Sequence, residues 1–157
     1  MKANYVFIIH QSISKHYFLD KSEKKQIISI HQKSFIGNLS AFCGAVSAAC
    51  GAGAAITYLH GGDGDAVSRT VINTLVNVGG IVCDGAKASC AAKIASSVDA
   101  AILGHELSMA GMVFQPGDGI VLEDVETTMR SIGHVARQGM KSTDEEILNI
   151  MTGEICP

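Results

Sequence analysis

The sequence predicts an all-α fold, a compact helical domain, from three observations. Apolar residues recur at helical spacing in several stretches, for example at Val67, Val71 and Leu75. Turns that contain glycine separate these stretches. The 157 residues are 47% hydrophobic, so a single domain of this length can bury a substantial core. The β-branched run 76–82 also fits a strand, but a sheet needs partner strands and no other such run exists.

The first 26 residues differ in composition from the rest of the chain. Residues 1–26 hold Lys, His, Ser and aromatic residues in no sustained period, whereas residues 27–157 are rich in Ala, Gly, Val and Ile. We expect residues 1–26 to be a divergent, poorly ordered leader and residues 27–157 to be the folded domain. No tandem repeat is evident at the periods of solenoid proteins.

Four helices are expected before residue 110. Ser40 is predicted to cap the second one, because a serine side chain accepts hydrogen bonds from the free N–H groups of a first turn. A glycine-rich turn at 60–64 ends that helix. The expected ranges are 22–36, 40–59, 65–78 and 86–103.

Two further helices are expected after the loop at residues 115–119. Residues 121–136 have one apolar face, with acidic residues in the first turn and arginines later, as the helix dipole prefers. Asp118 is interpreted as the N-cap of this helix, with a role in a site as the alternative. Residues Thr143 to Glu146 match a capping box, which predicts a short last helix through Met151.

Charge and cysteine content narrow the possible partners and the compartment. The net charge is -3 and the pI is near 6.0, so the chain has no overall positive charge to attract a phosphate backbone. We therefore expect no nucleic-acid partner. Residues 41–59 carry no charge, but they are mostly small residues, which favours a buried helix over a membrane span. Five cysteines without a signal peptide indicate a reducing, cytoplasmic location. We therefore expect no membrane partner.

Three cysteines lie in glycine-rich, almost uncharged surroundings: Cys43, Cys83 and Cys90. On one continuous helix Cys83 and Cys90 would stand about 10.5 Å apart along the axis. Gly85 favours a turn instead, so that Cys83 lies in a loop and Cys90 near the start of the next helix. The two thiolates can then converge where the helix dipole stabilises negative charge.

Several interpretations of these cysteines stay open. Three cysteines can hold three irons of a [4Fe-4S] cluster and leave the fourth iron open. A zinc site is the competing metal hypothesis, although no Cys-x-x-Cys pair occurs. The simplest alternative is that the cysteines are small buried hydrophobic residues. Cys50 and Cys156 are assigned structural roles.

Other motifs carry weaker hypotheses. Residues 51–53 resemble the start of a dinucleotide fingerprint, but close helix packing explains their glycines better, because no strand precedes them. His60, His105 and His134 are candidate acids or bases. Single histidines without a partner in the sequence are more often surface or core residues.

Six segments together resemble a known family. They are Ser34-Phe-Ile-Gly-Asn-Leu-Ser-Ala-Phe-Cys-Gly, Tyr58-Leu-His-Gly-Gly-Asp, Asn77-Val-Gly-Gly-Ile-Val-Cys-Asp-Gly-Ala-Lys, Ala95-Ser-Ser-Val-Asp-Ala-Ala, Pro116-Gly-Asp-Gly-Ile-Val and Asp124-Val-Glu-Thr-Thr. In this order they resemble the C-terminal part of the L-cysteine desulfidase family. That family is related to the α domain of iron–sulfur L-serine dehydratases. The resemblance runs from about Ile27 to Met151.

The resemblance implies a lyase that contains iron and sulfur. It implies a helical domain with an oxygen-sensitive [4Fe-4S] cluster held by Cys43, Cys83 and Cys90, and no pyridoxal phosphate. The open iron would bind the leaving group of L-cysteine or L-serine while a base removes the α-proton. The products would be pyruvate and ammonia, with sulfide released from cysteine. The identity of the base stays unknown.

The chain departs from the family in length. Family members are considerably longer, and the part that precedes this domain has no counterpart in residues 1–26. We therefore expect a truncated chain or one subunit of a split enzyme, with a complementary N-terminal subunit or a homo-oligomer as partner. The alternative function is a non-catalytic cluster-binding or interaction module that is inactive without the missing half.

Overall fold

The computed structural model describes residues 28–37 and 40–155, and it is all-helical there. The expected leader at 1–26 and Cys156 lie outside the described residues. The only pairing of extended backbone in the described part is an isolated antiparallel bridge between Phe42 and Val82. The predicted all-α fold is confirmed. The helices are α2 (Ile28–Ile36), α3 (Gly44–Leu59), α4 (Gly64–Val78), α5 (Cys90–Met109), α6 (Val125–His134), the π-helix η1 (Val135–Gly139) and α7 (Lys141–Thr152).

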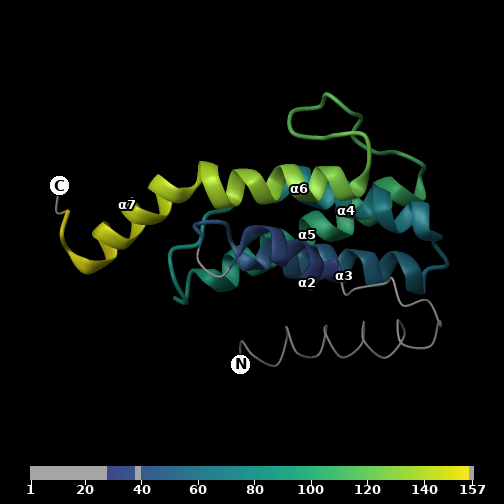
Figure 1. The fold of residues 1–157 in the computed structure, drawn as a ribbon. Coiled ribbons are helices and arrows are strands. Elements are labelled where there is room, and N and C mark those ends of the chain that lie inside the picture. Colours follow the sequence, from purple (N-terminus) through teal and green to yellow (C-terminus); the bar gives the residue numbers. More distant parts are fainter. Residues whose placement is uncertain (1–27, 38–39, 156–157) are drawn as a thin grey trace.

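Helices α3, α4 and α5 form the centre of the bundle and pack against one another (Figure 1). Small residues make this contact close. A Cβ atom on Gly53 would lie 3.1 Å from Thr70 Cγ2 and 3.2 Å from Ala101 Cβ. The interpretation of residues 51–53 as a site of close helix packing is therefore confirmed.

The uncharged helix α3 is buried by its neighbours. Helix α2 packs on α3 and α6, and α6 also packs on α4. Within the described part of the chain, no helix is both long enough and apolar enough to span a bilayer. The preference for a buried helix in this region is consistent with that finding.

Two of the predicted N-caps are wrong. Helix α3 begins after Cys43, not after Ser40, whose hydroxyl donates to the carbonyl of Ala136 at 2.7 Å. Helix α6 is capped by Asp124, which forms a capping box with Thr127. The Asp118 carboxylate instead accepts from the backbone N–H of Gln115 at 2.7 Å, within its own turn. Ser40 and Asp118 therefore bond to other backbone groups instead of to the helix ends that they were expected to cap.

The last helix exists as predicted, but it begins differently. No side chain caps α7, and its N-cap position is Met140. The capping box at Thr143–Glu146 is therefore wrong, because α7 already begins at Lys141, directly after η1. Figure 1 shows α7 running outward beyond α6, and none of its residues is buried.

Candidate functional site

The antiparallel bridge brings the segments of Cys43 and Cys83 side by side. The Cys43 N–H donates to the Ile81 carbonyl at 3.0 Å, and the Cys83 N–H donates to the Ala41 carbonyl at 2.5 Å. Because side chains alternate along extended backbone, Cys43 and Cys83 share one face, in diagonal positions about 7–8 Å apart. That separation is longer than a disulfide allows, and both cysteines are free.

Cys90 joins this group from the loop side. It is the first residue of α5, and its thiol donates to the Gly85 carbonyl at 2.9 Å. Gly85 has a φ of +85°, a left-handed conformation that favours glycine and turns the chain back toward the helix. The predicted arrangement, with Cys83 in a loop and Cys90 at a helix start, is confirmed.

The three thiols are close enough to influence one another electrostatically. Burial raises the pKa of the Cys43 thiol, and a hydrogen bond from the Ala45 backbone partly offsets this. The neighbouring thiols of Cys83 and Cys90 raise the pKa of Cys43 further. We call Cys43, Cys83 and Cys90 the cysteine group.

The cysteine group does not form a site for a single metal ion within the described residues. Nowhere in 28–37 or 40–155 do three His, Cys, Asp or Glu side chains come close enough together to hold one ion. The nearby interior nevertheless has a free donor. The amide nitrogen of buried Gln32 has no partner among the described residues, and its oxygen accepts from Ser47, one helical turn after Cys43. The residues present are thiols, the ligand type of iron–sulfur clusters, beside an unsatisfied donor.

Sequence reasoning missed Lys93, which lies on α5 three residues after Cys90. Its ammonium group donates to the Val82 carbonyl at 3.0 Å and to the Asp84 carboxylate at 2.5 Å. This hydrogen bond from Lys93 is the main reason why the pKa of Asp84 is lowered. The spacing of Cys90 and Lys93 was the available signal, because residues three apart share a helix face.

Cys50 is a core residue rather than part of the cysteine group. It lies in the middle of α3 with no exposed surface, and burial strongly raises the pKa of its thiol. The structural assignment of Cys50 is thus consistent with its position.

The structure pairs two of the candidate histidines, which the sequence analysis treated as single. His60 Nδ1 lies 3.0 Å from His105 Nε2, and His105 Nδ1 lies 3.0 Å from Thr57 Oγ1. Thr57 in turn bonds Thr70 at 2.7 Å, and Thr70 donates to the Ala66 carbonyl. Thr70 therefore accepts from Thr57, and Thr57 accepts from His105.

These bonds fix the proton positions when both imidazoles are neutral. His105 carries its proton on Nδ1, and its Nε2 accepts the Nδ1 proton of His60. The pair follows the end of α3, about 24 Å from Cys43 at ~1.5 Å per residue. His134 lies exposed in the last turn of α6. His60 and His105 thus lie too far away to act at the cysteine group.

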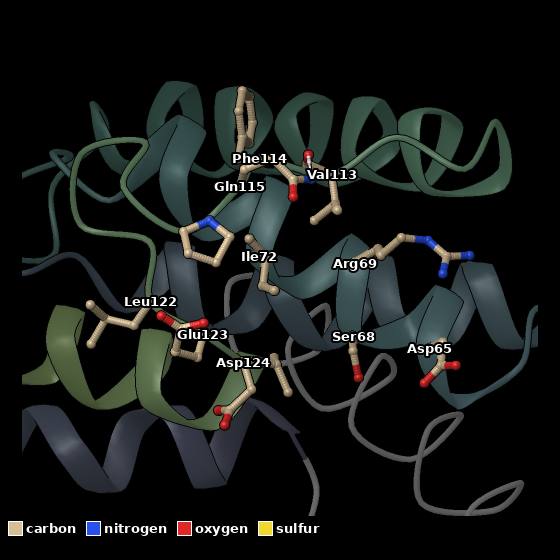
Figure 2. A pocket seen from close by; sticks show the side chains of 12 residues that line it. Asp65, Ser68, Arg69, Ile72, Val113, Phe114, Gln115, Leu122, Glu123 and Asp124 are labelled. Atoms are coloured by element: carbon tan, nitrogen blue, oxygen red, sulfur yellow. Dashed lines mark hydrogen bonds between the residues drawn. The ribbon is translucent and has the colours of Figure 1, made fainter.

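A cavity of about 380 Å³ lies in another part of the bundle. Figure 2 shows Arg69 on one side of this cavity, Glu123 on the other, and Ile72 between them. Its α4 residues lie between Asp65 and Ile72, whereas Cys83 follows the end of that helix at Val78. The cavity is therefore separate from the cysteine group.

Comparison with known proteins identifies relatives over most of the chain. Residues 25–149 match the family described as serine dehydratase alpha chain. The UPF0597 protein of Treponema denticola is 56% identical over 125 residues, which are 80% of this chain and 29% of the relative. The UPF0597 protein of Lachnoclostridium phytofermentans is 58% identical over 125 residues, which are 80% of this chain and 30% of the relative.

A third relative gives the same picture. The UPF0597 protein of Desulfitobacterium hafniense is 52% identical over 128 residues, which are 82% of this chain and 30% of the relative. The chain thus spans about 30% of the length of these curated relatives. No solved structure matches the chain.

Proposed function

We propose, because this chain belongs to the serine dehydratase alpha chain family, that it is the iron–sulfur part of a β-eliminating lyase. In this proposal residues 27–157 form the iron–sulfur domain, and Cys43, Cys83 and Cys90 hold a [4Fe-4S] cluster. The substrate is L-cysteine, with release of sulfide, or L-serine, with release of water. The protein works in the cytoplasm, where thiols stay reduced.

The observation that carries the proposal is the convergence of the cysteine group. The Phe42–Val82 bridge brings together two segments that are 40 positions apart in the sequence, and the bond from Cys90 to Gly85 adds the start of α5. Thiolates are the usual ligands of iron–sulfur clusters, which supports a cluster at these three residues. The helix starts at Cys43 and Cys90 add positive dipole ends, which favour thiolates.

The cysteine group would contribute three thiolate ligands. When bound, such a cluster supplies a Lewis-acidic iron for the leaving thiol or hydroxyl group of the substrate. The chain's own residues position the ligands: the bridge orients Cys43 and Cys83, and α5 presents Cys90. The free donor of Gln32, one turn from Cys43, is available to an anionic group. We assign none of the described residues as the base that would remove the α-proton of the substrate.

The test is anaerobic purification followed by measurement of iron and acid-labile sulfide. We expect a near-stoichiometric cluster in the wild type and its loss in Cys43→Ser, Cys83→Ser and Cys90→Ser. Cys50→Ala is the matched control, because this cysteine lies in the core, and it should keep the cluster. An iron-free wild type, or equal iron in all variants, would contradict the cluster assignment.

Activity is a separate question from cluster binding. Sulfide and pyruvate assays with L-cysteine and L-serine identify the preferred substrate. Because the chain spans about 30% of its relatives, turnover is expected to need the rest of the protein. Adding the remaining part of the Treponema denticola relative should then raise pyruvate formation.

An alternative proposal is an interaction module without catalysis, and the exposed apolar residues of α5 and α7 favour it. Ile102 and Leu103 of α5 are 44% and 50% exposed, and Ile150 of α7 is 62% exposed. Apolar surface of this kind is typical of a docking face for another chain or another copy. Binding of the remaining part of the relative without any turnover would support the module over the enzyme.

A further inference from the structure

Lys93 connects α5 to the two residues that flank Cys83, through the backbone of Val82 and the side chain of Asp84. One hydrogen bond goes to the carbonyl of Val82, the residue before Cys83. The other goes to the carboxylate of Asp84, the residue after it. A single side chain thus bonds both neighbours of one member of the cysteine group.

This arrangement limits how Cys83 can move. Apart from the bridge at Phe42, the segment from Ile81 to Gly85 has no regular secondary structure, and such segments open easily when their bonds are few. Bonds of an ammonium group to a carboxylate and a carbonyl are stronger than neutral ones. Lys93 therefore holds Cys83 against the start of α5, where Cys90 lies.

The same ammonium group places positive charge beside the thiols. Its nitrogen lies 3.0 Å from the Val82 carbonyl and 2.5 Å from the Asp84 carboxylate, which places it next to Cys83 in the loop. Lys93 also lies three residues after Cys90, on the same side of α5. The ion pair with Asp84 keeps the ammonium group of Lys93 both charged and fixed in position.

We propose that Lys93 is a positioning residue for the cysteine group, which fixes Cys83 through its neighbours and supplies a positive charge beside the thiolate ligands. The charge part of this inference rests on the proposed cluster function. The holding part does not, because it concerns the chain without a cluster.

The holding role is tested on the cluster-free full chain by hydrogen exchange. In Lys93→Gln we expect amide exchange in residues 81–85 to be about tenfold faster than in the wild type, because two charge-assisted bonds are lost. Lys141→Gln is the matched control: it removes the same charge at the exposed start of α7 and should leave these amides unchanged. Unchanged exchange in Lys93→Gln would overturn the holding role.

The charge role is tested by the reduction potential of the anaerobically reconstituted cluster. Lys93→Gln should shift the potential to more negative values, since removal of a nearby positive charge disfavours an added electron. Lys93→Arg keeps the charge and should stay near the wild type. Asp84→Asn should also loosen residues 81–85, but it removes a nearby negative charge, so its potential should shift in the opposite direction, to more positive values.

The outcomes separate this inference from the proposed function. A wild type without a cluster would contradict the proposed function and the charge role, while hydrogen exchange would still decide the holding role. A cluster whose potential is equal in Lys93→Gln and wild type would overturn the charge role and leave the function standing.

Discussion

The two ends of the parallel helices α3 and α5 differ in how their polar side chains are partnered. At one end lie Cys43 and Cys90, which are electrostatically coupled. At the other end His60 and His105 are joined by a hydrogen bond of 3.0 Å. The same pair of helices therefore presents thiols at its start and imidazoles at its finish.

At the histidine end, the buried ring nitrogens of His105 form hydrogen bonds with neighbouring side chains. His105 is 3% exposed, and both of its ring nitrogens have partners within the bundle. The cysteine end is held by main-chain bonds and by Lys93, and the amide nitrogen of Gln32 there has no hydrogen-bond partner in the described part of the chain. A closed network of this kind stabilises a fold, whereas soft ligands with an unused donor suit a bound group. The histidine end is therefore a stabilising network, and the cysteine end is where we propose that a cluster binds.

The largest expected effect is at Gly104, beside the histidine end. A Cβ atom there would lie 2.7 Å from Thr74 Oγ1 and 3.1 Å from the Thr70 carbonyl. Gly104→Val should lower the free energy of unfolding by about 3 kcal/mol, because neither neighbour can move easily. Urea unfolding measures this change.

Gly44 at the cysteine end provides the matched control. A Cβ atom on Gly44 meets nothing within 4 Å, so Gly44→Val should stay within about 0.5 kcal/mol of the wild type. Equal losses in the two variants would contradict the contrast in packing between the ends.

A smaller effect is expected from breaking the buried network. Thr57→Val keeps the shape but removes the acceptor for His105 and the donor for Thr70. The buried His105 N–H is then left without a partner, which should cost about 2 kcal/mol of unfolding free energy. Thr152→Val, on the exposed end of α7, should change stability by less than about 0.5 kcal/mol. A loss below that value for Thr57→Val would show that the network is not a source of stability.

The smallest effect concerns the alkaline limit of stability. Burial raises the pKa of Cys50 above its ordinary value of 9.0, so above pH 9 the unfolded chain loses this proton while the folded chain keeps it. Stability must then fall as pH rises, by about 1.4 kcal/mol per pH unit for one such thiol. Urea unfolding between pH 9 and 10.5 should show a steeper decline for the wild type than for Cys50→Ala. Parallel declines would mean that Cys50 titrates alike in both states.

Much of the helical architecture was predictable because its signals are local. The spacing of Val67, Val71 and Leu75 predicted α4 to within one residue of its observed start, and Gly85 predicted the turn before Cys90. Caps were less predictable. Ser40 and Asp118 are good capping residues, but each bonds to another partner that the folded chain brings closer.

In the candidate site, too, some features follow from local sequence and others only from the folded chain. The sequence by itself determined the helices, the turns between them and the choice of Cys43, Cys83 and Cys90 as candidate ligands, because helix periodicity and glycine turns act over a few residues. Tertiary structure alone decided which side chains meet. The Phe42–Val82 bridge spans 40 positions and the His60–His105 bond spans 45, and Lys93 reaches Val82 only because α5 folds back on the loop before it. Contacts of that kind depend on how whole helices pack, which no local pattern in the sequence specifies.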